Sequence, residues 1–316
     1  MYKIRQKTLK KVMTVSAITV AVASGLTGYV WYENQRPPLL EIYIFTLKSG
    51  QAIFLRTPSD KRILIDGGTN SEIIRQISSI LPFYTRRIDK IIVTKPDSRH
   101  VSGLIDVLGR YSVEEAILPA INLEDLSLST TTDQVYKTFT SLIENNSVPV
   151  KKVIAGDSLV LDSGFITDKI KYSSPSGTSS VGMDILFPMS ASSTFVYSRA
   201  SGPELVTRIS YGSTSVLLAG SVTPKIQKYI VKSSGAGMDI QNDVGDLKSD
   251  ILVIYQNATS SNIPAIFMGA VKPTYIVYSK KPDPLARIPE ENRFNIRDTG
   301  GVKIVSDGRD MKISRL

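Results

Sequence analysis

Four side chains that could bind ions follow a short apolar strand in the first third of the chain. The stretch IIVTKPDSRHVSGL, residues 91–104, contains Lys95, Asp97, Arg99 and His100 just before an apolar pattern that predicts a helix. Carboxylate oxygens and neutral imidazole nitrogens bind metal ions, whereas a protonated lysine has no lone pair and arginine stays protonated. The loop therefore allows two kinds of site: a metal held by Asp97 and His100, or an anion held by Lys95 and Arg99 at the start of a helix.

A metal in this loop needs a further ligand, and Asp66 in the stretch RILIDGG is the candidate. Three ligands are enough for a catalytic zinc. However, Lys95 and Arg99 would place two positive charges beside the ion, and each would repel it by several kcal/mol at a separation of ~4 Å in an intermediate dielectric. We therefore expect no metal and no cofactor. Zinc or manganese would bind only if Asp66, Asp97 and His100 form a rebuilt site for one ion.

The chain has one histidine and no cysteine, which excludes several chemistries. Disulfides, zinc ribbons and thiol catalysis all need cysteine. Serines are abundant, but none lies in a Gly-x-Ser-x-Gly turn beside a partnered base. We expect no catalytic residue of the nucleophilic type.

The net charge of +9 is unevenly distributed. The first 32 residues carry five basic and no acidic side chains, residues 33–270 carry equal numbers of both, and residues 271–316 carry ten basic and six acidic ones. The body of the chain is therefore neutral, and the pattern gives little support for a field that attracts nucleic acid.

An uncharged, apolar segment of 21 residues runs from Val12 to Tyr32, directly after a basic segment. A transmembrane helix needs about 20 such residues, and the basic flank predicts a cytoplasmic N-terminus. We predict a basic cytoplasmic tail at 1–11, a transmembrane anchor at 12–32, a linker at 33–38 and an exported domain at 39–316. The alternative is a signal peptide cleaved after Ala21-Val22-Ala23, which would give a secreted protein.

The segment from residue 39 predicts alternating strands and helices. Strands are expected at LEIYIFTL, QAIFLRT, RILIDGG, DKIIVT and EEAILP, and helices at SEIIRQISSIL, SRHVSGLIDVLGRY and TTDQVYKTFTSLIENN. This order is typical of a layered α/β sheet.

The second half of the chain repeats the pattern. Strands are expected at VKKVIAG, DSLVLD, GMDILFP, LVTRISYG, TSVLLAG, SDILVIY and TYIVYS, helices at TPKIQKYIVKS and NIPAIFMGAV, and a closing hairpin at GVKIVSDGRDMKI. Two successive blocks of this kind predict a four-layer αββα sandwich, with two sheets face to face and helices outside.

The order of these segments resembles the metallo-β-lactamase-fold domain at the C-terminus of ComEC-type competence proteins and in related hydrolases. The resemblance covers nearly everything after residue 39. In that family, a Thr-His-x-His-x-Asp-His loop holds two metals that activate a bridging water. The matching positions here are Lys95, Asp97, Arg99 and His100, so only the last histidine is unchanged.

Other family motifs that carry chemistry are also altered. The Leu-Leu-x-Gly-Asp turn, whose aspartate bridges both metals, ends here in Ser221. The later His-His-Gly-Ser turn begins here with Gln256 and Asn257, and the glycine-rich entry motif has become Leu47-Lys48-Ser49-Gly50-Gln51. The resemblance therefore implies that the metal ligands are lost.

The positions that shape the backbone in the family are retained. Asp66, Gly67 and Gly68 match an Asp-Gly-Gly turn, and Gly103 matches a glycine in the following helix. The resemblance implies that this framework keeps the fold while the chemistry has been removed.

We therefore expect a membrane-anchored, exported domain that is catalytically inactive and acts by binding a protein, a nucleotide or a nucleic acid. The family resemblance makes DNA uptake the expected setting. One alternative is a metal-dependent phosphodiesterase or nuclease with a rebuilt site for one metal. The other is a purely structural component of a membrane complex, attached through its N-terminal helix.

Overall fold

The structure is a computed structural model that describes residues 38–120, 130–163, 180–189, 204–234, 246–255, 263–282 and 288–316, together with short helical pieces between residues 13 and 28. The chain divides into two units, Met1–Pro38 and Leu39–Leu316. The expected basic tail, nine of the 21 residues of the expected anchor and most of the expected linker lie outside the described residues. Among the residues that are described, no helix is long and apolar enough to cross a membrane. The anchor stays a prediction.

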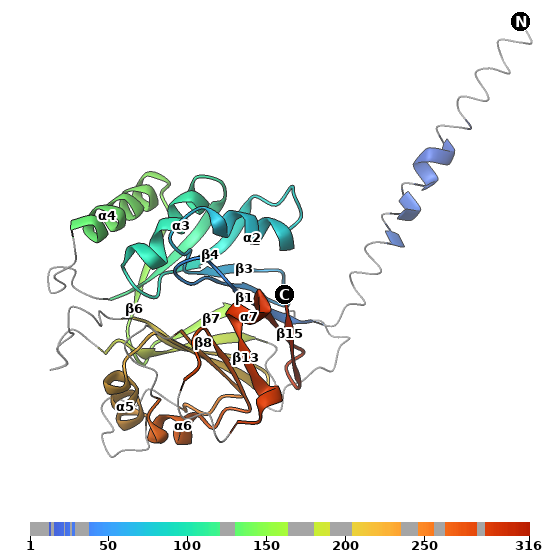
Figure 1. Cartoon of the computed structure of the whole chain (residues 1–316). Coiled ribbons are helices and arrows are strands. Elements are labelled where there is room, and N and C mark those ends of the chain that lie inside the picture. Colours follow the sequence, from blue (N-terminus) through green and yellow to red (C-terminus); the bar gives the residue numbers. More distant parts are fainter. Residues whose placement is uncertain are drawn as a thin grey trace, which may run out of the picture. The chain divides into compact units, whose positions relative to one another are not determined.

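The unit Leu39–Leu316 contains an eight-stranded sheet in the order β15-β14-β1-β2-β3-β4-β5-β6 (Figure 1). Its strands are β1 Leu40–Phe45, β2 Ile53–Arg56, β3 Arg62–Ile65, β4 Arg87–Ile92, β5 Ser112–Pro119, β6 Val150–Val153, β14 Gly301–Ser306 and β15 Met311–Arg315. Strands β3 to β6 pair in parallel, whereas the pairs from β15 to β3 are antiparallel.

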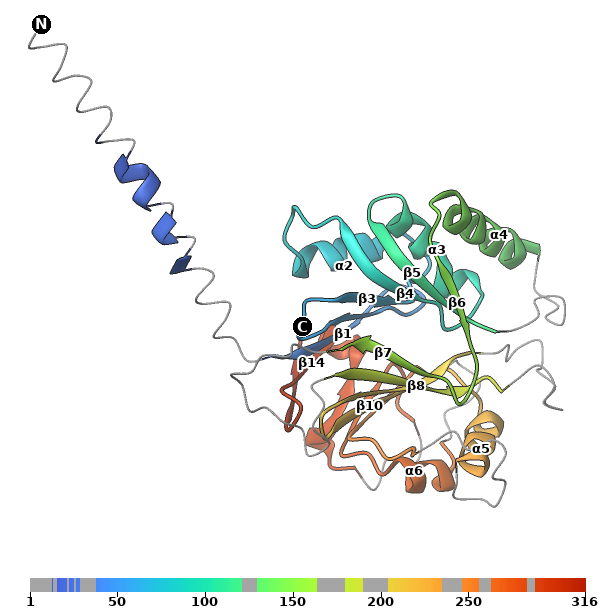
Figure 2. The same cartoon turned by 180° about the vertical axis from the view of Figure 1, so that it is seen from behind.

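A seven-stranded sheet lies against the first one, in the order β13-β12-β11-β10-β9-β8-β7 (Figure 2). Its strands are β7 Ser158–Asp162, β8 Val181–Phe187, β9 Val206–Tyr211, β10 Thr214–Gly220, β11 Ile251–Ile254, β12 Tyr275–Tyr278 and β13 Arg293–Asn295. Strands β10 to β13 run parallel to one another, so their carboxyl ends meet at one edge of the sheet.

Helices cover the outer faces of both sheets (Figures 1 and 2). They are α2 Glu72–Ile80, α3 Ser98–Leu108 and α4 Thr130–Asn145 on the first sheet, α5 Pro224–Ser233 and α6 Ala265–Val271 on the second, and the short η3 Glu290–Asn292 and α7 Ile296–Thr299. One apolar core lies between the sheets, a second lies under α2, α3 and α4, and a third lies under α5 and α6. Three apolar cores separate four layers, and this confirms the prediction of an α/β protein with two sheets and helices outside.

Two features of the sheets differ from the expected order. Strand β6, which the sequence pattern placed with the second half, pairs in parallel with β5 of the first sheet. The reason is that α4 supplies the crossover that a parallel pair requires. The C-terminal hairpin β14-β15 also returns to the first sheet, where β14 pairs with β1. The short elements β13 and α7 had no sequence signal strong enough to predict them.

Candidate functional site

Asp66 lies at the carboxyl end of β3 and is almost fully buried, with 1% of its surface exposed. Its Oδ1 accepts a hydrogen bond from the Thr94 backbone N at 2.8 Å. Its Oδ2 accepts bonds from the Thr94 hydroxyl at 2.5 Å and from the Gln51 side-chain amide at 3.0 Å. Burial raises the pKa of Asp66 to about 6, against the opposing effects of His100 and the bonds from Thr94. The carboxyl group therefore ties β3 to the loop after β4.

The two glycines after Asp66 bring that turn into direct contact with α3. The Gly67 N donates to the His100 carbonyl at 2.7 Å, and the Gly103 N donates to the Gly68 carbonyl at 3.0 Å. A Cβ atom on Gly103 would lie 1.9 Å from the Gly67 carbonyl oxygen, so only glycine fits there. Gly68 has a φ of +70°, which glycine adopts without strain. These framework positions set where α3 begins.

Asp97 is the N-cap of α3 and is bonded to three neighbours. Its Oδ1 accepts from the Arg99 backbone N at 2.9 Å and lies 2.5 Å from Nδ1 of His100. Its Oδ2 lies 3.8 Å from the Lys95 ammonium group. Lys95 is itself buried, with 8% of its surface exposed. Asp97 and Lys95 therefore neutralise one another at the start of the helix, beside His100.

The charges around His100 favour its protonated form. Burial lowers the pKa of His100, but the carboxylates of Asp66 and Asp97 outweigh burial and hold that pKa above its ordinary value. Burial raises the pKa of Asp97, but the bond from His100 and the nearby cations hold it below its ordinary value. A protonated imidazole donates from both nitrogens and has no lone pair for a metal.

Ser221 follows β10 and is held by Glu204, a residue that sequence reasoning missed. Its backbone N donates to Oε1 of Glu204 at 2.6 Å, and its hydroxyl donates to Oε2 at 2.5 Å. Glu204 is 2% exposed, and its charge also favours protonation of His100. The only signal in the sequence is one acidic residue before an apolar strand, which is too common to identify a site.

A cavity of about 190 Å³ opens beside the start of α3. Of the residues predicted from the sequence, it is lined by Arg99, His100 and Ser221 but not by Lys95 or Asp97. The remaining lining comes from the β1–β2 loop and from the ends of the second sheet, namely Thr46, Leu47, Lys48, Ser49, Gly50, Gln51, Tyr255, Ser279, Ile296 and Arg297. Gln256 and Asn257 lie outside the described residues.

The Tyr255 side chain in this cavity has an unusual environment. The residue is 8% exposed, and its hydroxyl has no hydrogen-bond partner among the described residues. Burial raises the pKa of Tyr255, so the hydroxyl is a neutral donor. It follows β11 directly, and the sequence pattern indicated only the end of a strand there.

The side chains present do not fit a metal ion. Asp97 and His100 are bonded to each other, Asp66 is bonded to Thr94 and Gln51, and Glu204 is bonded to Ser221. Within the part of the chain that the structure describes, no three His, Cys, Asp or Glu side chains gather in a way that could hold a metal. Binding a metal at Asp97 and His100 would require their mutual bond to break and Lys95 to move.

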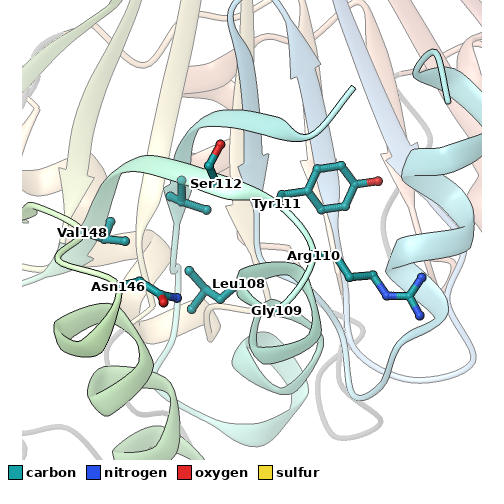
Figure 3. A pocket seen from close by; sticks show the side chains of 8 residues that line it. Leu108, Gly109, Arg110, Tyr111, Ser112, Asn146 and Val148 are labelled. Atoms are coloured by element: carbon teal, nitrogen blue, oxygen red, sulfur yellow. The ribbon is translucent and has the colours of Figure 1, made fainter. Parts of the chain in front are cut away.

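A second, larger cavity of about 360 Å³ lies at the other end of α3 (Figure 3). It is formed by the last turn of the helix, the turn into β5 and the segment after α4. Its lining residues are Leu108, Gly109, Arg110, Tyr111, Ser112, Val113, Asn146 and Val148. Among the described residues, no acid or histidine lines this cavity, and Arg110 is the one basic side chain there.

Comparison with known proteins finds relatives by structure alone. No protein-family model matches the chain, and no curated protein is similar to it in sequence. The metallo-β-lactamase-fold protein YhfI from Bacillus subtilis is 10% identical, with a TM-score of 0.43 over 77% of this chain and 87% of that one. The metallo-β-lactamase SMB-1, bound to 2-mercaptoethanesulfonate, is 15% identical, with a TM-score of 0.36 over 67% of this chain and 75% of that one.

A third similar structure is a metallo-β-lactamase from Cronobacter sakazakii, which is 14% identical, with a TM-score of 0.36 over 67% of this chain and 74% of that one. The structural neighbours are thus metallo-β-lactamase-fold proteins at low identity. Similarity at this level identifies no activity, ligand or partner for this chain.

Proposed function

We propose that this chain is a metal-independent binding protein with a metallo-β-lactamase-like fold, and that it does not hydrolyse a substrate. The observation that carries this proposal is the closed network at the start of α3. There Asp97 caps the helix, is bonded to His100 and lies beside the buried Lys95. The two groups best suited to hold a metal therefore stabilise each other instead.

Two free-energy costs oppose metal binding at this position. A metal at His100 needs a neutral imidazole, but the surrounding carboxylates favour the protonated ring. Lys95 is 8% exposed, so a cation placed beside it would meet a desolvated positive charge. Neither cost arises for a ligand that is an anion or is uncharged.

The proposal includes the cellular setting expected from the sequence. The apolar segment 12–32 holds the domain at the outer side of the cell membrane, where it takes part in DNA uptake by binding a protein, a nucleotide or a nucleic acid. The basic flank of that segment and the resemblance to ComEC-type domains support this setting.

Metal content tests the central claim. The full chain, purified in a mild detergent without chelator and dialysed against zinc and manganese, should retain far less than one equivalent of either metal. It should also fail to cleave bis(p-nitrophenyl) phosphate. One equivalent of metal that is lost in His100→Ala, together with cleavage that a chelator stops, would replace this proposal with the phosphodiesterase alternative.

Fractionation of cells tests the anchor. The intact chain should sediment with membranes and be released by detergent but not by high salt. A soluble product beginning just after Ala23 would show a cleaved signal peptide instead.

A further inference from the structure

We propose that the cavity at the N-terminal end of α3 binds a phosphoryl group, a compact anion with several charged oxygens, without the help of a metal. This inference rests on the proposed function, because it requires that no metal occupies the cavity. It goes further by naming the chemical class of the ligand and the residues that hold it.

The basic side chains Lys48, Arg99 and Arg297 line the cavity. Among the described lining residues there is no Asp or Glu, and the nearest carboxylates are engaged with His100, Thr94 and Ser221. Within the described residues, none of these three cations forms an ion pair, whereas Arg56, Arg62 and Arg87 of the same domain all do. Three cations without an ion pair in one concave site create a field that concentrates anions there.

These three cations come from distant parts of the chain. Lys48 lies in the loop between β1 and β2, Arg99 lies in the first turn of α3, and Arg297 lies in α7. All three side chains are exposed, so they can rearrange around a ligand. The fork of N–H groups on arginine matches the geometry of phosphate oxygens.

The direction of α3 adds to this field. The helix has 11 residues, and its positive end points to the same cavity that Arg99 and His100 line. Asp97 accepts one of the free N–H groups there, and its charge is balanced by Lys95 and His100. The residue that faces the cavity is therefore His100, and the Asp97 carboxylate behind it is already paired.

The Tyr255 hydroxyl is the independent sign that a ligand belongs here. Tyr255 lines the cavity and is 8% exposed, and its buried hydroxyl lacks a hydrogen-bond partner among the described residues. Leaving a buried hydroxyl without a partner is costly, and such groups are rare in folded proteins. A phosphoryl oxygen would accept the proton that this hydroxyl offers.

The size of the cavity limits the ligand. Its volume of about 190 Å³ is smaller than that of typical sites for drug-sized molecules, which occupy ~300 to 1,000 Å³. A phosphate or pyrophosphate group fits this space, and the rest of a larger phosphate ester would extend into solvent.

Calorimetric titration of the full chain, in mild detergent with EDTA present, tests the inference. The probes are inorganic phosphate, pyrophosphate and glycerol 3-phosphate, with acetate as a singly charged comparison. We expect at least one phosphoryl probe to bind saturably and more tightly than acetate, with affinity that falls as salt rises. Absence of saturable binding by all three phosphoryl probes would overturn the inference.

Four variants distinguish binding in this cavity from unspecific binding to a basic protein. Arg99→Gln and Arg297→Gln should each weaken binding by about tenfold or more, and Tyr255→Phe by about fivefold. The matched control is Arg110→Gln at the other end of α3, which should bind like the parent chain. Equal weakening by Arg110→Gln would show an unspecific effect of net charge and overturn the site. Thermal unfolding of each variant verifies that the fold is intact.

The probes and the chelator separate the remaining cases. Tightest binding of inorganic phosphate or pyrophosphate would identify a free ion as the ligand, whereas tightest binding of glycerol 3-phosphate would identify the end of a larger molecule. Phosphoryl binding that appears only with metal and vanishes with EDTA would overturn both this inference and the metal-independent function. No phosphoryl binding by a metal-free chain would overturn this inference alone.

Discussion

The two ends of α3 border cavities of opposite character. The cavity at the N-terminal end has about 190 Å³, and its lining includes Lys48, Arg99, Arg297 and Tyr255, whose buried hydroxyl has no partner among the described residues. The cavity at the C-terminal end has about 360 Å³, but Arg110 is the one charged residue among the described residues that line it (Figure 3). The smaller cavity is therefore the better candidate for binding, because charge and unsatisfied donors matter more than volume.

The polarity of the helix explains part of this difference. A helix carries partial positive charge at its N-terminus and partial negative charge at its C-terminus. Arg110 lies two residues beyond the end of α3 at Leu108, where a cation stabilises the helix itself. At the N-terminal end, by contrast, cations add to the positive charge of the helix, and their repulsion is relieved when an anion binds.

The largest expected effect concerns two glycines, Gly103 in the middle of α3 and Gly109 at its C-terminal cap. In Gly103→Ala, the new Cβ would overlap the Gly67 carbonyl oxygen at 1.9 Å, so the free energy of unfolding should fall by about 3 kcal/mol or more. In Gly109→Ala, the nearest atom is 3.6 Å away and the backbone is already helical, so stability should stay equal or rise by about 0.5 kcal/mol. Urea unfolding followed by circular dichroism compares the two. A similar loss of unfolding free energy in both variants would show that the contact between Gly103 and Gly67 is no tighter than the surroundings of Gly109.

The second prediction concerns pH. The pKa of Asp66 is raised by burial to about 6, and that of His100 is raised by its carboxylate neighbours. A raised pKa means that the folded state binds the proton more tightly, so both groups stabilise the fold at low pH. The Asp66 contribution is lost between about pH 4 and 6, and the His100 contribution is lost as pH rises through its raised pKa.

The Asp66 loss should amount to about 2 kcal/mol between pH 4.5 and 8, and the loss at His100 has the same sign. Urea unfolding at several pH values measures this slope. Asp66→Asn should flatten it, whereas Asp106→Asn, which alters an exposed carboxyl group on α3, should leave it unchanged. A slope of opposite sign would show that the hydrogen bonds from Thr94 and Gln51 outweigh burial at Asp66.

The third prediction concerns the cap of α3. Asp97→Ala removes the bond to the Arg99 N and the partner of the buried His100, so stability at pH 6 should fall by about 2 kcal/mol. Asp97→Asn retains an acceptor for the Arg99 N and should lose less. At the other end, Arg110→Ala should change stability by less than ~0.5 kcal/mol. Equal effects of Asp97→Ala and Asp97→Asn would mean that the hydrogen bond to the Arg99 N contributes nothing and that the whole loss comes from the charge of Asp97.

The smallest effect is expected at Tyr255, and its sign is opposite. Tyr255→Phe removes a buried hydroxyl without a described partner, so the ligand-free chain should become more stable by about 1 kcal/mol. Tyr111→Phe in the C-terminal cavity is the matched control and should be neutral. Thermal unfolding with and without phosphate measures both. A loss of stability in Tyr255→Phe without ligand would show that the hydroxyl already has a partner.

Much of the fold could be predicted because its signals are local. The strands from Leu40 to Arg56, the helix at Ser98–Leu108 and the pairing of sheets with outer helices all follow from apolar periodicity. The position of β6 could not be read in this way, because partner choice depends on the crossover through α4. The return of β14 to β1 joins residues more than 250 positions apart, and no local pattern encodes that contact.

The candidate site was predicted in part for the same reason. The sequence identified the loop from Lys95 to His100, the framework glycines and Ser221. It treated Lys95 and Arg99 as equivalent cations, whereas only Arg99 lines the cavity and Lys95 is buried against Asp97. The direction of each side chain depends on where the turn after Asp66 contacts α3. That contact joins two separate elements, so no local sequence pattern predicts it.

The sequence by itself therefore determined the chemical character of this protein: no cysteine, one histidine, a charged loop before a helix and alternating strands and helices. Only the tertiary structure decided which groups act together. Lys48, Tyr255 and Arg297 reach one cavity because the two sheets pack face to face and bring their loops to a common edge. Residue types and periodicity are properties of neighbouring positions, whereas a binding site is made by the burial of apolar surface between distant ones.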